Sequence, residues 1–156
     1  LGVTAPDAAE GGVAYAMKAF MGGYEPLSGS VGDLAEFNLQ ASADGPIIRG
    51  ALNSLRAVTA SGVGPGSQLL SVEAGRKLYA ALFVTALAEG AELDVIIRSA
   101  ASDTFSGAVS RITFPTVDEA GGYWDVFEGT TAHTWFRPSF TLTGASAAVA
   151  LVLAVQ

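Results

Sequence analysis

The side chains that could carry out chemistry in this 156-residue chain are few and widely spaced. His133 is the single histidine, and the chain has no cysteine. A serine hydrolase would have to use His133, yet no Gly-x-Ser-x-Gly motif is present to place a nucleophile on a sharp strand-to-helix turn. We therefore expect His133 to be a strand-end residue with a packing or hydrogen-bonding role.

Acidic residues offer a second possible chemistry, the paired carboxylates of a glycosidase. Asp118 and Glu119 are adjacent, and Glu128 stands alone nine residues further on. Adjacent acids in a glycine-bounded turn are far more often solvated charges than a catalytic pair. The sequence therefore favours a surface role for these three carboxylates.

Residues 62–66 form a Gly-x-Gly-x-Gly run that superficially resembles a phosphate-binding loop. The run lacks the Lys-Ser/Thr ending of such loops, and Pro65 removes an amide donor where several are needed. A lone histidine cannot complete a zinc site, and no calcium-loop motif is present. We predict no catalytic residue, no cofactor and no metal, and we do not expect an enzyme.

Aromatic residues are the strongest remaining signal, because exposed aromatic rings on a β-sandwich can stack on sugars. They cluster late in the chain, at Tyr123, Trp124, Phe127, Trp135 and Phe136. Most of these rings should lie in the core, since each buries about 150–250 Å². Trp135 is the candidate for a ring that faces a glycan.

The composition excludes several classes of protein. With 50% hydrophobic and 15% charged residues the chain is expected to fold, and its net charge of −7 argues against a surface for sequence-specific nucleic-acid binding. The longest apolar run, residues 145–155, is about half of what a membrane-spanning helix needs, so no membrane partner is expected. Nineteen glycines favour short strands and tight turns, which predicts an all-β fold.

The elements that must position these side chains are clearest in the second half of the chain. Alternating hydrophobicity predicts two long strands joined by a turn at Gly144, with Phe140 and Leu151 on the buried faces. Further strands are expected at residues 77–87, 92–98, 109–114 and 122–127. This spacing is typical of a sandwich or jelly roll over residues 68–156.

The first half has a different character. We expect a strand at residues 13–21, a long glycine-rich loop at 22–32, and a hairpin of strands 34–42 and 46–52 with its turn at Asp44-Gly45. Residues 60–67, rich in glycine and proline, are predicted to be a linker that ends an N-terminal segment, 1–59. The loop and its edge carry four apolar residues that a monomer would gain by covering, which makes them the predicted subunit contact: Tyr24, Leu27, Val31 and Leu34.

Several of these strand sequences resemble a known family. Residues 77–84, 93–99, 111–114 and 134–144 look like the C-terminal β-sandwich of tail-tube-like structural proteins of tailed bacteriophages. Upstream, residues 10–15, 29–34 and 49–52 are similar to the second half of the tube-forming domain that precedes that sandwich. The resemblance implies a partial tail-tube-like β domain followed by a jelly-roll or Ig-like antiparallel sandwich, in a processed or partial chain.

The same resemblance implies a function in assembly. The chain is expected to be a virion structural protein, most simply a tail-tube or tail protein that forms rings with copies of itself and contacts neighbouring virion proteins. A capsid decoration protein and a carbohydrate-binding sandwich are the alternatives. Ring-shaped assemblies would distinguish a tail protein from a decoration protein. Glycan binding that is lost on Trp135→Ala would favour the carbohydrate-binding sandwich.

Overall fold

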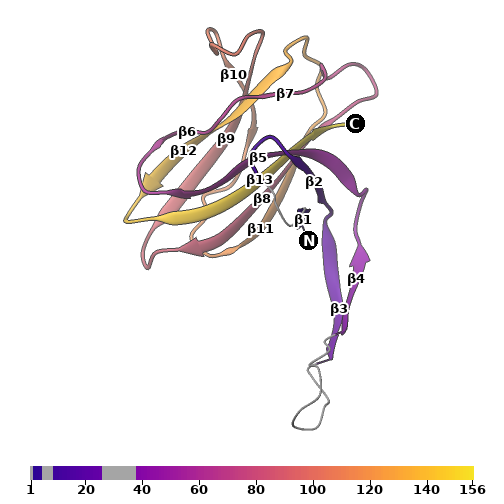
Figure 1. Ribbon diagram of the computed structural model, residues 1–156, viewed down its shortest axis with the longest axis vertical. Helices are drawn as coiled ribbons and strands as arrows, with labels where there is room; N and C mark the ends of the chain where they lie inside the picture. The colour runs from indigo at the N-terminus through magenta and orange to yellow at the C-terminus, as the bar shows by residue number, and fades with distance from the viewer. Residues whose placement is uncertain (1, 5–8, 26–37) are drawn as a thin grey trace.

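The computed structural model describes residues 2–4, 9–25 and 38–156, which form thirteen β-strands and no helix (Figure 1). The predicted all-β class is confirmed. In chain order the strands are β1 (Gly2–Thr4), β2 (Val13–Ala16), β3 (Ala19–Glu25), β4 (Asn38–Ala43), β5 (Ile48–Val58), β6 (Gly62–Val63), β7 (Ser67–Gln68), β8 (Leu78–Leu87), β9 (Glu92–Ala100), β10 (Val109–Thr113), β11 (Gly121–Phe127), β12 (Trp135–Thr143) and β13 (Ala147–Val155).

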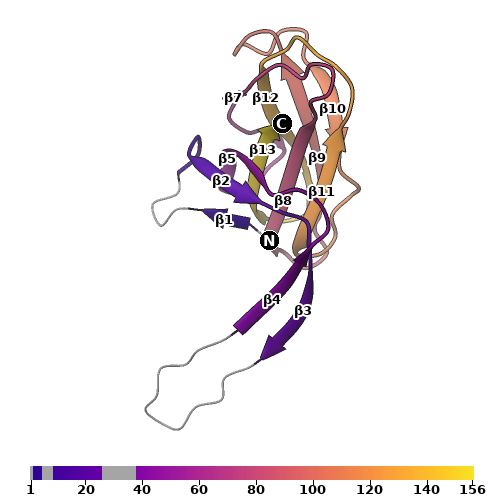
Figure 2. The same cartoon turned by 90° about the vertical axis from the view of Figure 1, so that its right-hand side faces the viewer.

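Two antiparallel sheets stack as a sandwich, and a third, two-stranded sheet projects from it (Figures 1 and 2). Sheet I contains six strands in the order β1-β2-β5-β13-β8-β11. Sheet II has the order β10-β9-β12-β6, and β7 also pairs with β12. The projecting sheet consists of β3 and β4, which we call the arm.

The main core lies between sheets I and II and follows the alternation of the strands. Phe140 on β12 is 3% exposed and Leu151 on β13 is 0% exposed, as the sequence predicts. β13 is covered on both faces, because Val152 and Ala154 on its other parity are buried as well. The largest fully buried side chains of this core are Val72, Leu78, Leu82, Leu93, Val95, Ile97, Ile112, Phe136, Leu151 and Leu153.

A second, smaller apolar cluster covers the other face of sheet I. It joins buried side chains of β2 and the start of β5 to those of β8 and β13: Ala14, Ala16, Ile48, Leu52, Ala81, Val152 and Ala154. Gly50 allows this packing, because a Cβ atom at Gly50 would lie 2.2 Å from the carbonyl oxygen of Leu153. Beta5 therefore passes β13 at a distance that no other residue type permits.

The predicted linker at residues 60–67 is wrong, because this segment is part of the sandwich. It contains β6 and the first residue of β7, which pair with β12. The amide of Gly64 donates to the carbonyl oxygen of Pro138 at 2.9 Å, and the buried Asn53 side chain donates to the carbonyl oxygen of Pro65 at 3.0 Å. The division into residues 1–59 and 68–156 fails for the same reason, since β5 lies between β2 and β13 in sheet I.

Two strand partnerships also differ from the prediction. The Asp44-Gly45 turn does not close a hairpin, because β4 pairs with β3 whereas β5 pairs with β2 and β13. The last two strands are joined by a short turn, as expected, but they lie in different sheets, β12 beside β9 and β13 between β5 and β8. The predicted strand at residues 13–21 is divided into β2 and β3, and β3 extends into the predicted loop as far as Glu25.

Candidate functional site

The arm is the feature that distinguishes this molecule from a plain sandwich. Beta3 and β4 point away from both sheets in two perpendicular views (Figures 1 and 2). They pair with each other, from Ala19↔Ala43 to Glu25↔Asn38, and with no other strand in the described part of the chain. The ladder contains one irregularity, between Met21 and Gly23. The arm thus presents a two-stranded ribbon whose outer edges are both unpaired among these strands.

A local polar contact joins the two strands of the arm at its base. Lys18 Nζ lies 3.0 Å from a carboxylate oxygen of Asp44, and the amide of Asp44 donates to the carbonyl oxygen of Lys18 at 2.8 Å. Both side chains are about half exposed, so the ion pair contributes little stability. It does hold the two strands together where they leave sheet I.

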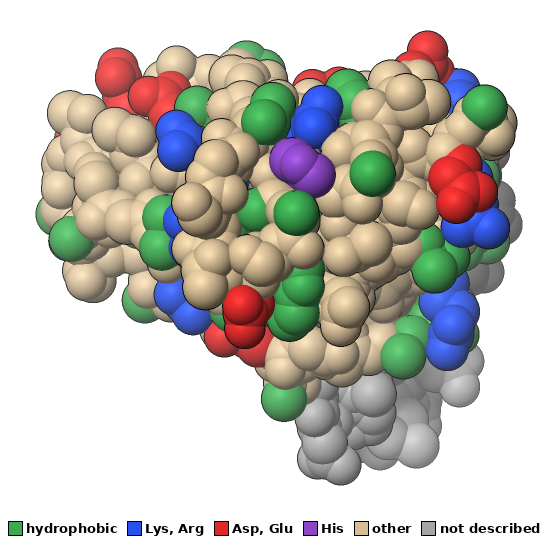
Figure 3. Space-filling model, turned by 90° about the horizontal axis from the view of Figure 1, so that it is seen from above, with side chains coloured by type: hydrophobic (Ala, Val, Ile, Leu, Met, Phe, Trp, Pro, Cys, Tyr) green, Lys and Arg blue, Asp and Glu red, His purple; other side chains and the backbone are tan. Residues whose placement is uncertain are grey.

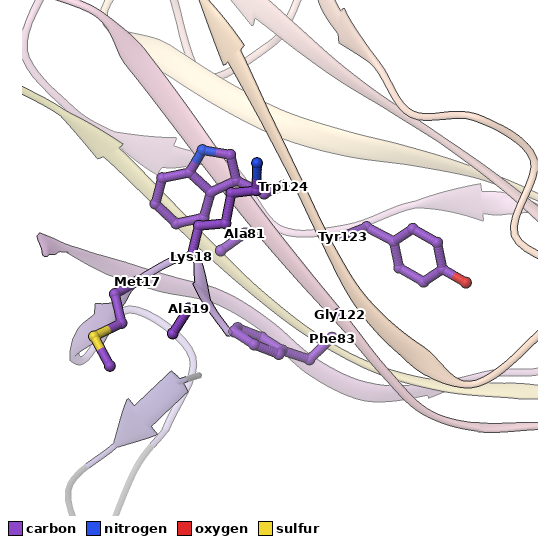
Figure 4. Close-up of a pocket in the computed structure, with 8 residues that line it drawn as sticks. All are labelled: Met17, Lys18, Ala19, Ala81, Phe83, Gly122, Tyr123 and Trp124. Atoms are coloured by element: carbon purple, nitrogen blue, oxygen red, sulfur yellow. The ribbon is translucent and has the colours of Figure 1, made fainter. Parts of the chain in front are cut away.

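A pocket of about 300 Å³ lies beside this base, between the β2–β3 connection and the outer face of sheet I. It is lined by Met17, Lys18, Ala19, Ala81, Phe83, Gly122, Tyr123 and Trp124. Figure 4 shows the rings of Phe83 and Trp124 and the Met17 side chain on one side of the sheet, whereas the ring of Tyr123 points to the other side. The half-buried rings of Phe83 and Trp124 give this pocket an apolar part, whereas polar atoms make up most of its exposed lining.

The same pocket borders an open sheet edge. Beta11 is the terminal strand of sheet I and pairs only with β8 among the described strands. Tyr79 on β8 contacts Trp124 on β11, with ring centroids 5.8 Å apart and planes at 56°. An unpaired edge next to a pocket with aromatic rings in its lining can accept an added strand, with backbone hydrogen bonds giving affinity and the pocket giving selectivity.

The predicted contact residues are placed only in part. Tyr24 belongs to β3 and is the backbone partner of Leu39 on β4. Leu27, Val31 and Leu34 lie outside the described residues. The sequence prediction missed the pocket, although Phe83 on the second apolar parity of β8 was a usable signal that this strand is covered on both faces.

Trp135 lies on the outward side of β12 and is half-buried. Its indole is close to Gly66, where a Cβ atom would lie 3.5 Å from the ring and 2.8 Å from the ring of Phe105. The residue predicted to face a glycan is therefore packed into a small aromatic group on sheet II. The pocket with Trp124 is a separate place on sheet I.

His133 belongs to a polar cluster with Ser99, Arg111 and Thr131. Its Nδ1 atom lies 3.0 Å from Ser99 Oγ, and Arg111 donates to the same oxygen at 2.7 Å and to Thr131 Oγ1 at 3.0 Å. Because Arg111 can only donate, Ser99 can direct its own proton to His133. Ser99 is fully buried, so its hydroxyl cannot reach a substrate. The expected hydrogen-bonding role of His133 is confirmed.

The three acidic residues considered as a glycosidase pair, Asp118, Glu119 and Glu128, have different surroundings in the structure. Glu128 forms an ion pair with Lys77, and this hydrogen bond holds the pKa of the Glu128 carboxyl below its usual range. A glycosidase acid requires the opposite shift. Asp118 and Glu119 are exposed, and Tyr123 donates to the backbone carbonyl of Glu119 at 2.9 Å. Burial raises the pKa of Tyr123, with Glu119 and Asp118 adding to the effect.

Charge is interspersed on the face seen from above, where basic and acidic side chains lie singly or in small groups among polar and apolar ones (Figure 3). Within residues 2–4, 9–25 and 38–156 no three metal-ligating side chains converge. The described part also contains no helix with the length and hydropathy needed to cross a membrane.

Comparisons with models of protein families, with curated proteins and with solved structures find no match to the chain.

Proposed function

We propose that the chain is a structural protein of a tailed-bacteriophage virion, a tail-tube or tail protein that assembles through its arm. The arm is the observation that carries the proposal. A two-stranded ribbon alone is at best marginally stable in water, and β3 and β4 find no third strand in the described part of their own sandwich. A neighbouring subunit supplies the missing cover.

The sandwich offers a matching surface for that neighbour. The rings of Phe83 and Trp124 in the pocket can contact apolar side chains of that neighbour, and the free edge of β11 can pair with a strand. An arm that leaves one copy and docks on the next is a heterologous contact, which closes into a ring when its rotation permits. This geometry supports the ring-forming assembly that the family resemblance implies.

The test replaces the residues between β3 and β4 in the sequence and keeps both strands. Because Glu25 and Asn38 are directly paired, residues 26–37 can be exchanged for the two residues Asn-Gly, which form a tight hairpin turn. The sandwich should keep its unfolding midpoint, whereas rings or tubes seen by negative-stain electron microscopy should be lost. A matched control exchanges the same residues for a Gly-Ser segment of equal length. Normal assembly of the Asn-Gly variant contradicts the proposal.

The way in which the isolated chain assembles distinguishes a tail protein from a capsid decoration protein. Rings or tubes of the isolated chain support the tail protein, whereas binding of monomers or small oligomers to preformed capsids supports a decoration protein. The arm serves either role, so this experiment and not the fold decides between them.

Carbohydrate binding is the second candidate, because half-buried aromatic rings line the pocket on sheet I. Tyr79 and Trp124 form a tilted pair there, and Phe83 lies on the same strand as Tyr79. Binding on a glycan array that is lost with Trp124→Ala would favour this function. Loss with Trp135→Ala alone would instead point to sheet II.

A further inference from the structure

Two arginines stand side by side on the outer face of sheet II. Arg98 on β9 and Arg137 on β12 are direct partners in the antiparallel ladder. Their neighbours Ile97 and Phe136 are fully buried in the main core, so both arginines project outward. Directly opposite residues have Cβ atoms about 4.5–5.5 Å apart. Two positive charges are thus held close together by the backbone.

Neither charge is balanced within the described part of the chain. Lys18, Arg56 and Lys77 each pair with a carboxylate, but Arg98 and Arg137 do not. Like charges directly opposite each other destabilise a sheet. In addition, the Nε–H groups of both arginines are buried without a hydrogen-bond acceptor, and an unpaired buried donor carries a full desolvation cost.

The nearest carboxylate of the same strand face is already engaged. Asp94, two alternate positions along β9, accepts a hydrogen bond from Thr116 at 2.7 Å. The outward neighbours across the ladder, Trp135 and Ser139, carry no charge. Sheet II therefore supplies two cations and no anion at this point.

Arg137 also contacts an aromatic ring on the outer face of sheet II. Its guanidinium carbon lies 4.1 Å from the centre of the Phe105 ring, which belongs to the β9–β10 loop. Phe105 is 6% exposed and has a φ of 53°, a left-handed conformation that is strained for an aromatic residue. Gly66 leaves room for this ring, because a Cβ atom there would lie 2.8 Å from it. The loop is thus closed over Arg137 in a fixed geometry.

We infer that Arg98 and Arg137 form a binding site for an oxyanion of the carboxylate or phosphate class. A guanidinium presents parallel N–H donors that match two oxygens of such a group. One oxyanion between the two side chains would neutralise the repulsion and give the orphaned donors an acceptor. The anion is either a free small molecule or a carboxylate of a second copy, which a chain of net charge −7 offers in number.

The first test uses inorganic phosphate as the probe on the full-length chain, with chloride at equal ionic strength as the reference. For a dissociation constant on the order of 1 mM, about 10 mM phosphate should raise the unfolding midpoint by roughly 3–6 °C. Arg98→Gln and Arg137→Gln should each weaken calorimetric phosphate binding about tenfold or more. Arg49→Gln, which removes an exposed arginine of β5, is the matched control and should bind as the parent does.

Lysine substitutions keep the test informative if a glutamine variant does not fold. Arg98→Lys and Arg137→Lys retain the charge but lose the paired donors, so they should also weaken binding relative to the parent. Phosphate binding that is equal in the parent and in all four variants overturns the inference. A parent whose midpoint does not respond to phosphate or sulfate overturns it as well, unless the second copy already fills the site.

Sedimentation distinguishes a free oxyanion from a carboxylate of a second copy. It also decides whether a parent that does not respond to phosphate has its site filled by that second copy. If a carboxylate of a second copy occupies the site, phosphate should compete, and assemblies of the parent should become smaller as phosphate rises while Arg137→Gln is already small. If a free oxyanion occupies it, assembly size should not change. No midpoint response together with phosphate-independent sedimentation leaves the site without a ligand and refutes the inference.

Discussion

At the scale of single residues, Phe140 and Leu151 test whether the main core is assigned to the correct strand faces. Both are almost fully buried between sheets I and II. Phe140→Ala should lower the free energy of unfolding by about 3–5 kcal/mol and Leu151→Ala by about 2–5 kcal/mol, because each leaves a cavity. Leu55→Ala, at a half-exposed position, should change it by less than about 0.5 kcal/mol. Urea titration measures all three, and losses below about 1 kcal/mol at either core position would show the faces inverted.

Glu10 gives a residue-scale prediction on pH. Its carboxylate accepts from the guanidinium of Arg56 at 3.1 and 3.2 Å and from the amide of Leu55 at 3.1 Å. The Arg56 hydrogen bond is the main cause that lowers the pKa of Glu10 below its ordinary value of 4.5, against an opposing effect of burial. A lowered pKa in the folded state means that the stabilisation is present above the ordinary pKa and disappears as pH falls below it.

Glu10→Gln should therefore lower stability at pH 7 by about 0.2–1 kcal/mol, the range of exposed ion pairs. It should also reduce the loss of stability between pH 5 and the acid transition, where the parent releases the Arg56 contact. Glu89→Gln, in an exposed turn, is the control. Thermal unfolding across this pH range is the measurement, and parallel curves for parent and Glu10→Gln would refute the assignment.

Residue-scale features were predictable where they depend on local alternation and not where they depend on contacts between distant strands. Period-two hydrophobicity is enough to bury Phe140 and Leu151. The hydrogen bond of His133 to Ser99 joins residues 34 positions apart, and the ladder that places Arg98 opposite Arg137 depends on the register of β9 and β12. Alternation identifies an inward face but contains no information about the partner strand.

At the scale of elements, the strands from β8 to β13 were predictable to within a few residues because glycine and polar turns separate them. Their pairing was not. The short turn at Gly144 looks like a hairpin, yet the chain crosses there from sheet II to sheet I. The Asp44-Gly45 signal failed in the same way, because the arm gives β4 a closer partner in β3.

Gly50 is the element-scale prediction, because it decides whether β5 can pass β13. A Cβ atom there would lie 2.2 Å from the Leu153 carbonyl oxygen and 2.8 Å from the Ala154 side chain. Gly50→Ala should lower the free energy of unfolding by about 1–3 kcal/mol, the range of overpacked cores, and Gly50→Val by more. Gly62→Ala is the matched control in a strand, since no atom lies within 4 Å of its added Cβ. Equal urea midpoints for the two alanine variants would contradict the close approach.

At the scale of the whole molecule, the sandwich was predictable and its extent was not. A glycine- and proline-rich segment without periodicity is typical of a linker, and on this pattern residues 60–67 are predicted to divide the chain. In the structure that segment is bound to both sheets: Asn53 of β5 donates to Pro65 and to Ser67, and Gly64 bonds to Pro138 of β12. Gly64 and Gly66 serve close packing, because a Cβ atom would lie 2.6 Å from the Pro138 ring at Gly64 and 2.8 Å from the Phe105 ring at Gly66.

The pocket and the arm belong to the same scale, and they explain why a candidate site was only half visible in the sequence. The apolar loop residues indicated that some surface in the N-terminal half needs a cover. The pocket, however, combines Met17 from the β2–β3 connection with Phe83 and Trp124 from strands far along the chain. No local pattern could bring these three residues together, because their proximity depends on the order of strands in sheet I.

Sheet I contains strands from both halves of the chain, because β5 lies between β2 and β13. The last prediction concerns a fragment that begins at Ser67. Such a fragment contains β7 to β13 but lacks β5, the partner of β13 over residues 51–58. Removing β5 exposes one edge of β13, takes Val58 away from the main core, and takes Leu52 and Ile48 away from the second cluster. An unpaired, apolar central strand is prone to aggregation. We expect the fragment to be aggregated or unfolded by circular dichroism, whereas the full chain unfolds cooperatively.

Co-expression provides the control for that experiment. Residues 1–66 supplied as a separate chain should restore a soluble, cooperatively unfolding complex, because β5 can pair with β13 without a covalent connection through residues 60–67. The same complex carrying Gly50→Val should form poorly, since β5 could no longer approach Leu153. A Ser67–Gln156 fragment that folds alone with the unfolding midpoint of the full chain would show that β5 is dispensable, and the sandwich would then be an independent C-terminal domain after all.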